Sequence, residues 1–95
     1  MQKLYSMLGL ARRAGKLLVG RDSVMASVKK GRVRLVLLTR DASPRHRQEL
    51  EALGYRGELI TANCTMLDLV AAIGKKSCIV ALEDENFTNA IQHLI

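Results

Sequence analysis

The sequence predicts a three-layer α/β/α sandwich, and three observations support this fold class. Apolar residues at helical spacing alternate along the chain with apolar runs of strand length. The runs at 35–38 and 78–82 are apolar throughout, which is typical of strands covered on both faces. The chain has 95 residues, 48% of them hydrophobic, which is enough for one core. We therefore expect a single domain, residues 1–95, with helices on both faces of one sheet.

The first helix and strand are predicted from apolar spacing. Four residues near the start recur at the spacing of one helical face and predict a helix over 2–14. They are Leu4, Met7, Leu8 and Ala11. Gly15 ends this helix, and the short apolar run at 16–19 predicts a brief strand.

The second helix and strand follow the next glycine. This helix is expected after Gly20, with an N-cap from the pair Asp22 and Ser23, and it ends at Gly31. The residues at 32–39 predict a strand, because their apolar run is too continuous for a sheet with one wet face.

A proline marks the start of the third helix. Pro44 is suited to a first helical turn, and either Asp41 or Ser43 can cap it. This helix extends to about Leu53, and the residues at 58–62 predict a strand of weaker pattern.

The last three elements complete the alternation. Residues 63–65 cap a fourth helix that extends through Ile73, and residues 77–82 predict a second buried strand. A final helix begins at Asp84. Its apolar face consists of Phe87, Ala90, Ile91 and Leu94.

Positive charge is concentrated in the first half of the chain. Residues 1–47 contain twelve Lys and Arg against two Asp, whereas residues 48–95 contain three against seven Asp and Glu. This segregation predicts a positive surface for a polyanion such as nucleic acid. With one Phe, two Tyr and no Trp, the chain lacks the aromatic residues of a base-stacking sheet.

No sequence pattern supports catalysis. The segment 9–17 resembles a phosphate-binding loop, but five residues separate its glycines and Leu17 replaces the magnesium-binding hydroxyl. Neither His46 nor His93 accompanies a nucleophile motif. The carboxylates at 83–85 are expected to interact favourably with a helix N-terminus. We therefore expect no enzyme activity and no cofactor.

The cysteines and the apolar runs indicate the cellular compartment in which we expect the protein. Cys64 and Cys78 belong to no CxxC pair, so we expect reduced thiols and no metal site. No apolar stretch approaches the length of a membrane span, and the N-terminal segment lacks the apolar region of a secretory signal. We expect a cytoplasmic protein without membrane contact.

The segment 20–23 is the strongest candidate for binding an anion. A helix N-terminus presents free backbone N–H groups, and a glycine there lets a phosphate backbone come close. Arg21 could bond a phosphate or a guanine edge, while Asp22 and Ser23 could accept from base amino groups. An alternative is that Asp22 or Ser23 serves only as the helix cap.

Several segments, taken in order, resemble the L7Ae family of ribosomal proteins, in particular its small bacterial members. They are Leu8–Leu17, Val19–Gly20, Lys30–Gly31, Leu35–Leu38, Asp41–Pro44 and Ala72–Lys75. The resemblance covers nearly the whole chain. It implies an α/β/α sandwich around a four-stranded mixed sheet. It also implies binding of structured RNA, typically kink-turns, which are helix–internal loop–helix elements bent around tandem sheared G·A pairs.

The resemblance also implies where RNA binds. In the family, the start of the second helix enters the groove at the G·A pairs, and the loop before the last strand contacts a flipped-out nucleotide. Lys16 and Arg40, at neighbouring strand ends, could reach phosphates. The two segments that correspond to the helix start and the loop are Gly20, Arg21, Asp22 and Ser23, and Gly74, Lys75, Lys76 and Ser77.

The chain departs from the family pattern at polar positions. Asp22 and Ser23 stand where the archaeal and eukaryotic pattern has Asn and Glu, which read the G·A pairs. Two lysines of that pattern fall at Ala26 and Met66. We expect the basic residues of the two segments to compensate through phosphate contacts.

The leading hypothesis is therefore a non-enzymatic RNA-binding protein, ribosomal or ribosome-associated. Its expected partner is rRNA or another kink-turn RNA, which it binds as a monomer. The alternative is a protein-interaction module that diverged from an RNA-binding ancestor, with its replaced polar residues marking the loss of RNA binding.

Overall fold

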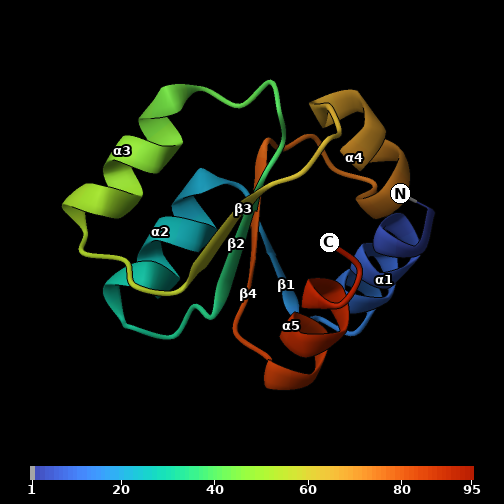
Figure 1. Cartoon of the computed structure of the whole chain (residues 1–95), viewed down its shortest axis with the longest axis horizontal. Coiled ribbons are helices and arrows are strands. Elements are labelled where there is room, and N and C mark those ends of the chain that lie inside the picture. Colours follow the sequence, from blue (N-terminus) through green and yellow to red (C-terminus); the bar gives the residue numbers. More distant parts are fainter. Residues whose placement is uncertain (1) are drawn as a thin grey trace.

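The computed structural model describes residues 2–95, in which helices and strands alternate as the sequence predicts (Figure 1). The observed strands are shorter than predicted at 16–19, 32–39, 58–62 and 77–82, because their outer residues belong to the connecting turns. The elements are α1 (Gln2–Arg13), β1 (Leu17–Val19), α2 (Arg21–Lys29), β2 (Leu35–Leu38), α3 (Pro44–Ala52), β3 (Glu58–Thr61), α4 (Met66–Ile73), β4 (Ile79–Leu82) and α5 (Glu85–Gln92).

The four strands form one mixed sheet in the order β1-β4-β2-β3. β4 is antiparallel to both β1 and β2, and β2 is parallel to β3. The register places Leu82 opposite both Leu17 and Leu35. The prediction of a four-stranded mixed sheet is therefore confirmed.

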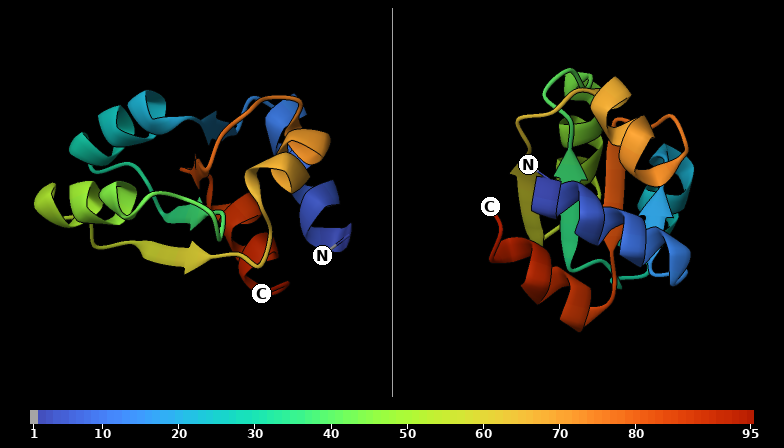
Figure 2. Two further views of the ribbon diagram at one scale, coloured as in Figure 1. Left: turned by 90° about the horizontal axis from the view of Figure 1, so that it is seen from above. Right: turned by 90° about the vertical axis from the view of Figure 1, so that its right-hand side faces the viewer.

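Helices cover both faces of the sheet and form the outer layers of a three-layer sandwich (Figure 2). Leu35 and Leu37 pack in a core with residues of α1, α4 and α5, whereas Val36 and Leu38 pack in a second core with residues of α2 and α3. Successive side chains of a strand point to opposite faces, so an entirely apolar strand supplies both cores. Each fully buried aliphatic side chain contributes about 1.5–3 kcal/mol of hydrophobic stabilisation.

The last helix, α5, ends before the last residue of the apolar pattern that predicts it. Ile91 is fully buried, and Phe87 packs against the same core. Leu94 lies beyond the end of α5 and is 37% exposed, so its assignment to the apolar face of this helix is wrong. The helix ends at Gln92, before the Leu94 side chain can pack under it.

Candidate nucleic-acid interface

The strand directions bring two of the predicted segments to one end of the sheet. Because β4 is antiparallel to its neighbours, its start lies beside the ends of β1 and β2. The Gly20 N–H donates to the Ile79 carbonyl at 3.1 Å, and the Thr39 N–H donates to the Cys78 carbonyl at 2.9 Å. The α2 start, the loop before β4 and Arg40 therefore share this end. We call the set Gly20–Ser23, Arg40 and Gly74–Ser77 the candidate site.

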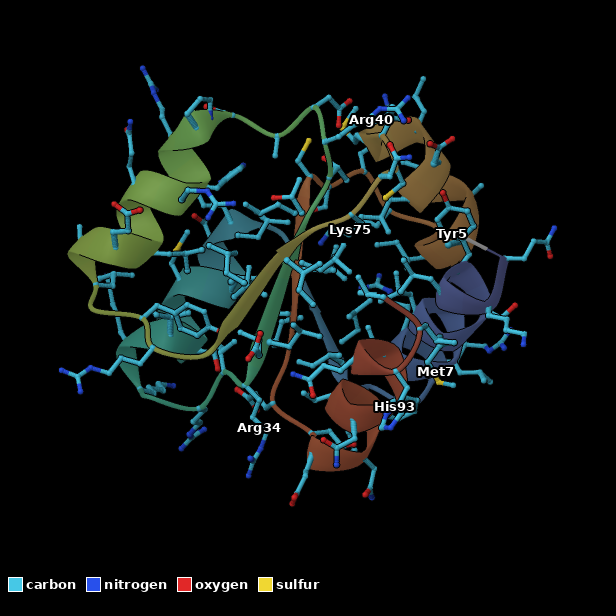
Figure 3. All side chains as sticks on the ribbon, viewed as in Figure 1. Tyr5, Met7, Arg34, Arg40, Lys75 and His93 are labelled. Atoms are coloured by element: carbon cyan, nitrogen blue, oxygen red, sulfur yellow. The ribbon has the colours of Figure 1, made fainter. Side chains whose placement is uncertain are left out.

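Lys16 does not join the candidate site. It precedes Leu17, which pairs with Leu82 at the far end of β4. Four residue steps separate Lys16 from Gly20, which corresponds to about 13 Å in an extended chain. The expectation that Lys16 and Arg40 lie at neighbouring strand ends is wrong, because β1 carries its first and last residues to opposite ends of the sheet. Arg34 lies at the same far end as Lys16, away from Arg40 and Lys75 (Figure 3).

The first turn of α2 has no side-chain cap. Its N-cap is Gly20, with φ of 96°, and no side chain among residues 2–95 accepts a cap hydrogen bond there. In contrast, the N-caps of the three later helices each accept from a backbone N–H of their own first turn. Those caps are Ser43, Thr65 and Asp84.

The expected N-cap role of Asp22 and Ser23 is wrong. The helix begins at Arg21, so these residues occupy its second and third positions and are both exposed. Gly20 takes the cap position because its backbone is in the left-handed region, which glycine adopts without a side-chain clash. The first-turn N–H groups of α2 therefore have no side-chain acceptor among residues 2–95, which leaves them available to an anion.

Arg21 is held by two carboxylates. Its Nε donates to the Glu49 Oε1 atom at 2.7 Å, and its NH2 group bonds the second oxygen of the same carboxylate. Its NH1 group donates to the Asp22 Oδ1 atom at 2.9 Å. Hydrogen bonding from Arg21 lowers the pKa of Glu49 and keeps that carboxyl ionised. Because Glu49 comes from α3, no local pattern around the α2 start could indicate this pair.

The four predicted residues of the loop before β4 differ in role: two stabilise the turn and two expose their side chains to solvent. Gly74 caps α4 in the left-handed conformation, with φ of 74°. Ser77 is buried, and its hydroxyl both donates to the Ile79 carbonyl at 2.6 Å and accepts from the Ile79 N–H at 3.1 Å. Lys75 and Lys76 are exposed, and their side chains bond to no other residue of 2–95. The turn thus presents two unpaired ammonium groups.

Arg40 is the residue of the candidate site that contacts the segment just before α4. Its NH1 group donates to the Asn63 Oδ1 atom at 2.9 Å, and its backbone N–H donates to the Cys64 carbonyl at 2.8 Å. Arg40 is exposed and makes no ion pair with a carboxylate of residues 2–95. The sequence did not indicate Asn63 as its partner, because the two residues meet only where β2 and β3 end side by side.

Within residues 2–95, no three His, Cys, Asp or Glu side chains are grouped so as to hold a metal ion. Over the same residues, none of the helices combines the length and apolar character needed to cross a membrane. Cys64 and Cys78 are both free thiols.

The fold and the site define a class of α/β/α proteins with an open helix start beside a basic loop. The sequence matches the ribosomal protein L7Ae/L30e/S12e/Gadd45 family over residues 2–91, and the chain belongs to this family. A relative from Bacillus subtilis (strain 168), named RNA-binding protein YlxQ, is 32% identical over 96% of this chain and 93% of its own length. A protein of the same name from Enterococcus faecium is 26% identical over 99% of this chain and 92% of its own length.

Solved structures agree on the fold. A Bacillus halodurans protein of unknown function has a TM-score of 0.82 and 28% identity, covering 99% of this chain and 97% of its own. The Giardia lamblia 15.5kD RNA binding protein has a TM-score of 0.68 and 15% identity, covering 98% of this chain and 82% of its own. The prediction that the chain is not an enzyme agrees with its family and with the names of its relatives.

Proposed function

We propose that the protein binds structured RNA through the candidate site. The observation that carries this proposal is the position of an uncapped helix start next to a loop with two unpaired lysines. Phosphate oxygens accept hydrogen bonds from free backbone N–H groups at a helix start, and lysines at close range add charge. The names of the Bacillus subtilis and Enterococcus faecium relatives support the same function.

The proposed contacts divide into two kinds. The α2 first turn and Lys75 with Lys76 bind phosphates, which fixes the position of the RNA without reading its sequence. Asp22 and Ser23 face outward from the first turn and can accept from base amino groups. Gly20 leaves the space above the turn open, since no heavy atom of residues 2–95 outside Gly20 and its two chain neighbours lies within 4 Å of where a side chain would begin.

We further propose that the preferred RNA is a kink-turn, in rRNA or another RNA of the cytoplasm, and that the protein binds it as a monomer. A bent RNA fits this surface because the helix start and the loop are adjacent but come from different segments. One strand of the RNA can contact the helix start while the other RNA strand contacts the loop.

A titration with two matched RNAs tests both RNA binding and the preference for a kink-turn. A fluorescent kink-turn RNA and a version with its G·A pairs disrupted are each titrated at two salt concentrations. We expect tighter binding to the intact kink-turn, and affinity that falls as salt rises because bound phosphates release counterions. Equal affinity for both RNAs would contradict kink-turn preference, and no binding to either would contradict RNA binding.

A further inference from the structure

The guanidinium of Arg21 has a carboxylate partner at each of its three nitrogens. Glu49 takes Nε and NH2, and Asp22 takes NH1. A guanidinium has five N–H donors, so three are already committed to protein oxygens. One donor on NH1 and one on NH2 remain, so an RNA phosphate or base edge must displace Glu49 only if it binds the Nε–NH2 edge of Arg21.

The side chains of Arg21, Asp22 and Glu49 together carry two negative charges and one positive charge. The Asp22 side chain is 96% exposed, so its carboxylate can turn away into solvent when RNA approaches. The Glu49 side chain is only 32% exposed and lies on the side of α3 that faces α2. Its charge remains near Arg21, where it attracts the guanidinium and repels a phosphate.

The Glu49 pair also affects the direction of the Arg21 side chain. α3 and α4 cover opposite faces of the sheet (Figure 1), and the loop with Lys75 connects α4 to β4. The bidentate bond to Glu49 therefore draws the guanidinium toward α3, away from the loop.

We propose that Glu49 is an affinity-limiting residue for RNA, because it competes with RNA phosphate for the Nε–NH2 edge of Arg21 and releases that edge when RNA binds. This inference rests on the proposed function and adds a residue of α3 to the determinants of binding. Arg21, followed by the nearby His46 and Lys29, lowers the pKa of Glu49. The competing charge is therefore present at neutral pH.

The test compares Glu49→Gln with a matched control on the same helix. Glu51→Gln removes an exposed charge that makes no side-chain hydrogen bond or ion pair with residues 2–95. We expect Glu49→Gln to bind the kink-turn RNA about two- to fivefold more tightly, the range of an exposed ion pair. Glu51→Gln should change the affinity by less than about 1.5-fold.

A double-variant comparison separates competition for Arg21 from a general charge effect. In an Arg21→Ala background, Glu49→Gln should give a smaller gain in affinity than in the wild type, because no guanidinium remains to be released and only the repulsion between Glu49 and phosphate is removed. The Arg21 Nε–H resonance gives a second readout by NMR. It should shift when RNA is added to the wild-type protein, and Glu49→Gln should shift it in the free protein.

The outcomes distinguish this inference from the proposed function. Unchanged or weaker binding by Glu49→Gln, an equal gain from Glu51→Gln, or a gain of the same size in the Arg21→Ala background would overturn the role of Glu49. An Arg21 Nε–H resonance that RNA does not move would do the same. If the wild-type protein binds no RNA, the proposed function itself fails and the inference fails with it.

Discussion

The starts of α2 and α4 lie at the same end of the sheet but use their backbone N–H groups differently. At α4, the Thr65 hydroxyl accepts from the Asp68 N–H at 3.2 Å, and the Asp68 carboxylate accepts from the Thr65 N–H at 2.9 Å. Asp41 adds a third acceptor, for the Met66 N–H at 3.0 Å. At α2, the cap position is Gly20 and no side chain among residues 2–95 fills this role.

This difference separates a structural helix start from one available to a ligand. A side-chain cap satisfies N–H groups that would otherwise bond to water or an anion, and it stabilises the fold by about 0.5–2 kcal/mol. The α4 start has this stabilisation and leaves little for a ligand. The α2 start lacks it, so its donors remain open next to Lys75 and Lys76.

The largest expected effect comes from removing charge beside the open helix start. We expect Lys75→Ala with Lys76→Ala to weaken RNA binding about 10- to 30-fold at 0.15 M salt, because two phosphate contacts are lost. The slope of log affinity against log salt should decrease by about 1 to 2. Fluorescence titrations over a salt series measure both. An unchanged slope would show that these lysines do not contact phosphate.

The second prediction compares stability at the two helix starts. We expect Thr65→Ala to lower the free energy of unfolding by about 1 kcal/mol, because the α4 cap is lost. Ser23→Ala, at the uncapped α2 start, should change it by less than about 0.5 kcal/mol. Urea denaturation measures both variants. Equal destabilisation by the two would mean that α2 also depends on a side-chain cap.

The third prediction concerns the acid limit of stability. Hydrogen bonds from Thr65 lower the pKa of Asp68, so the ionised carboxylate stabilises the fold above its unfolded pKa of about 3.9. This contribution is lost as the pH falls through the still lower folded pKa. Asp68→Asn should therefore show a smaller loss of stability than the wild type between about pH 5 and 2. Thermal unfolding at stepped pH tests this, and parallel curves would contradict it.

The smallest expected effect is at the far end of the sheet. Lys16→Ala should change RNA affinity by less than about twofold, because Lys16 lies about 13 Å from Gly20 along the strand direction and retains only a screened interaction with the RNA. Lys75→Ala serves as the comparison, since it also removes one exposed lysine. If Lys16→Ala weakened binding as much as Lys75→Ala, the RNA surface would have to extend along the sheet beyond the candidate site.

The order and type of every element followed from local patterns. Helical spacing at Leu4, Leu8 and Ala11 and the apolar strands at 35–38 and 79–82 are features of neighbouring residues, and burial keeps those residues in the core. Element ends were less predictable. Asp22 and Ser23 are residue types that favour cap positions, and they predict the α2 cap there. The glycine conformation at position 20 instead decides where the helix begins.

The candidate site was predictable only in part. Gly20–Ser23 and Lys75 with Lys76 could be identified from glycine, charge and family resemblance. The inward direction of the Ser77 side chain could not, since it depends on how the loop turns into β4. The far position of Lys16 depends on the antiparallel pairing of β1 with β4. The pairing of Arg21 with Glu49 joins residues 28 positions apart.

By itself, the sequence determined the fold class, the two-faced core and a positive charge excess in the first half, because these depend on composition and on the spacing of neighbouring residues. The tertiary structure decided which cations act together and which are neutralised. Coulomb interactions and hydrogen bonds fall off over a few ångströms, so they depend on strand order and helix packing. The charge that the sequence assigns to Arg21 is therefore shared with α3, and the unpaired charge beside the α2 start comes from Lys75 and Lys76 in the acidic half.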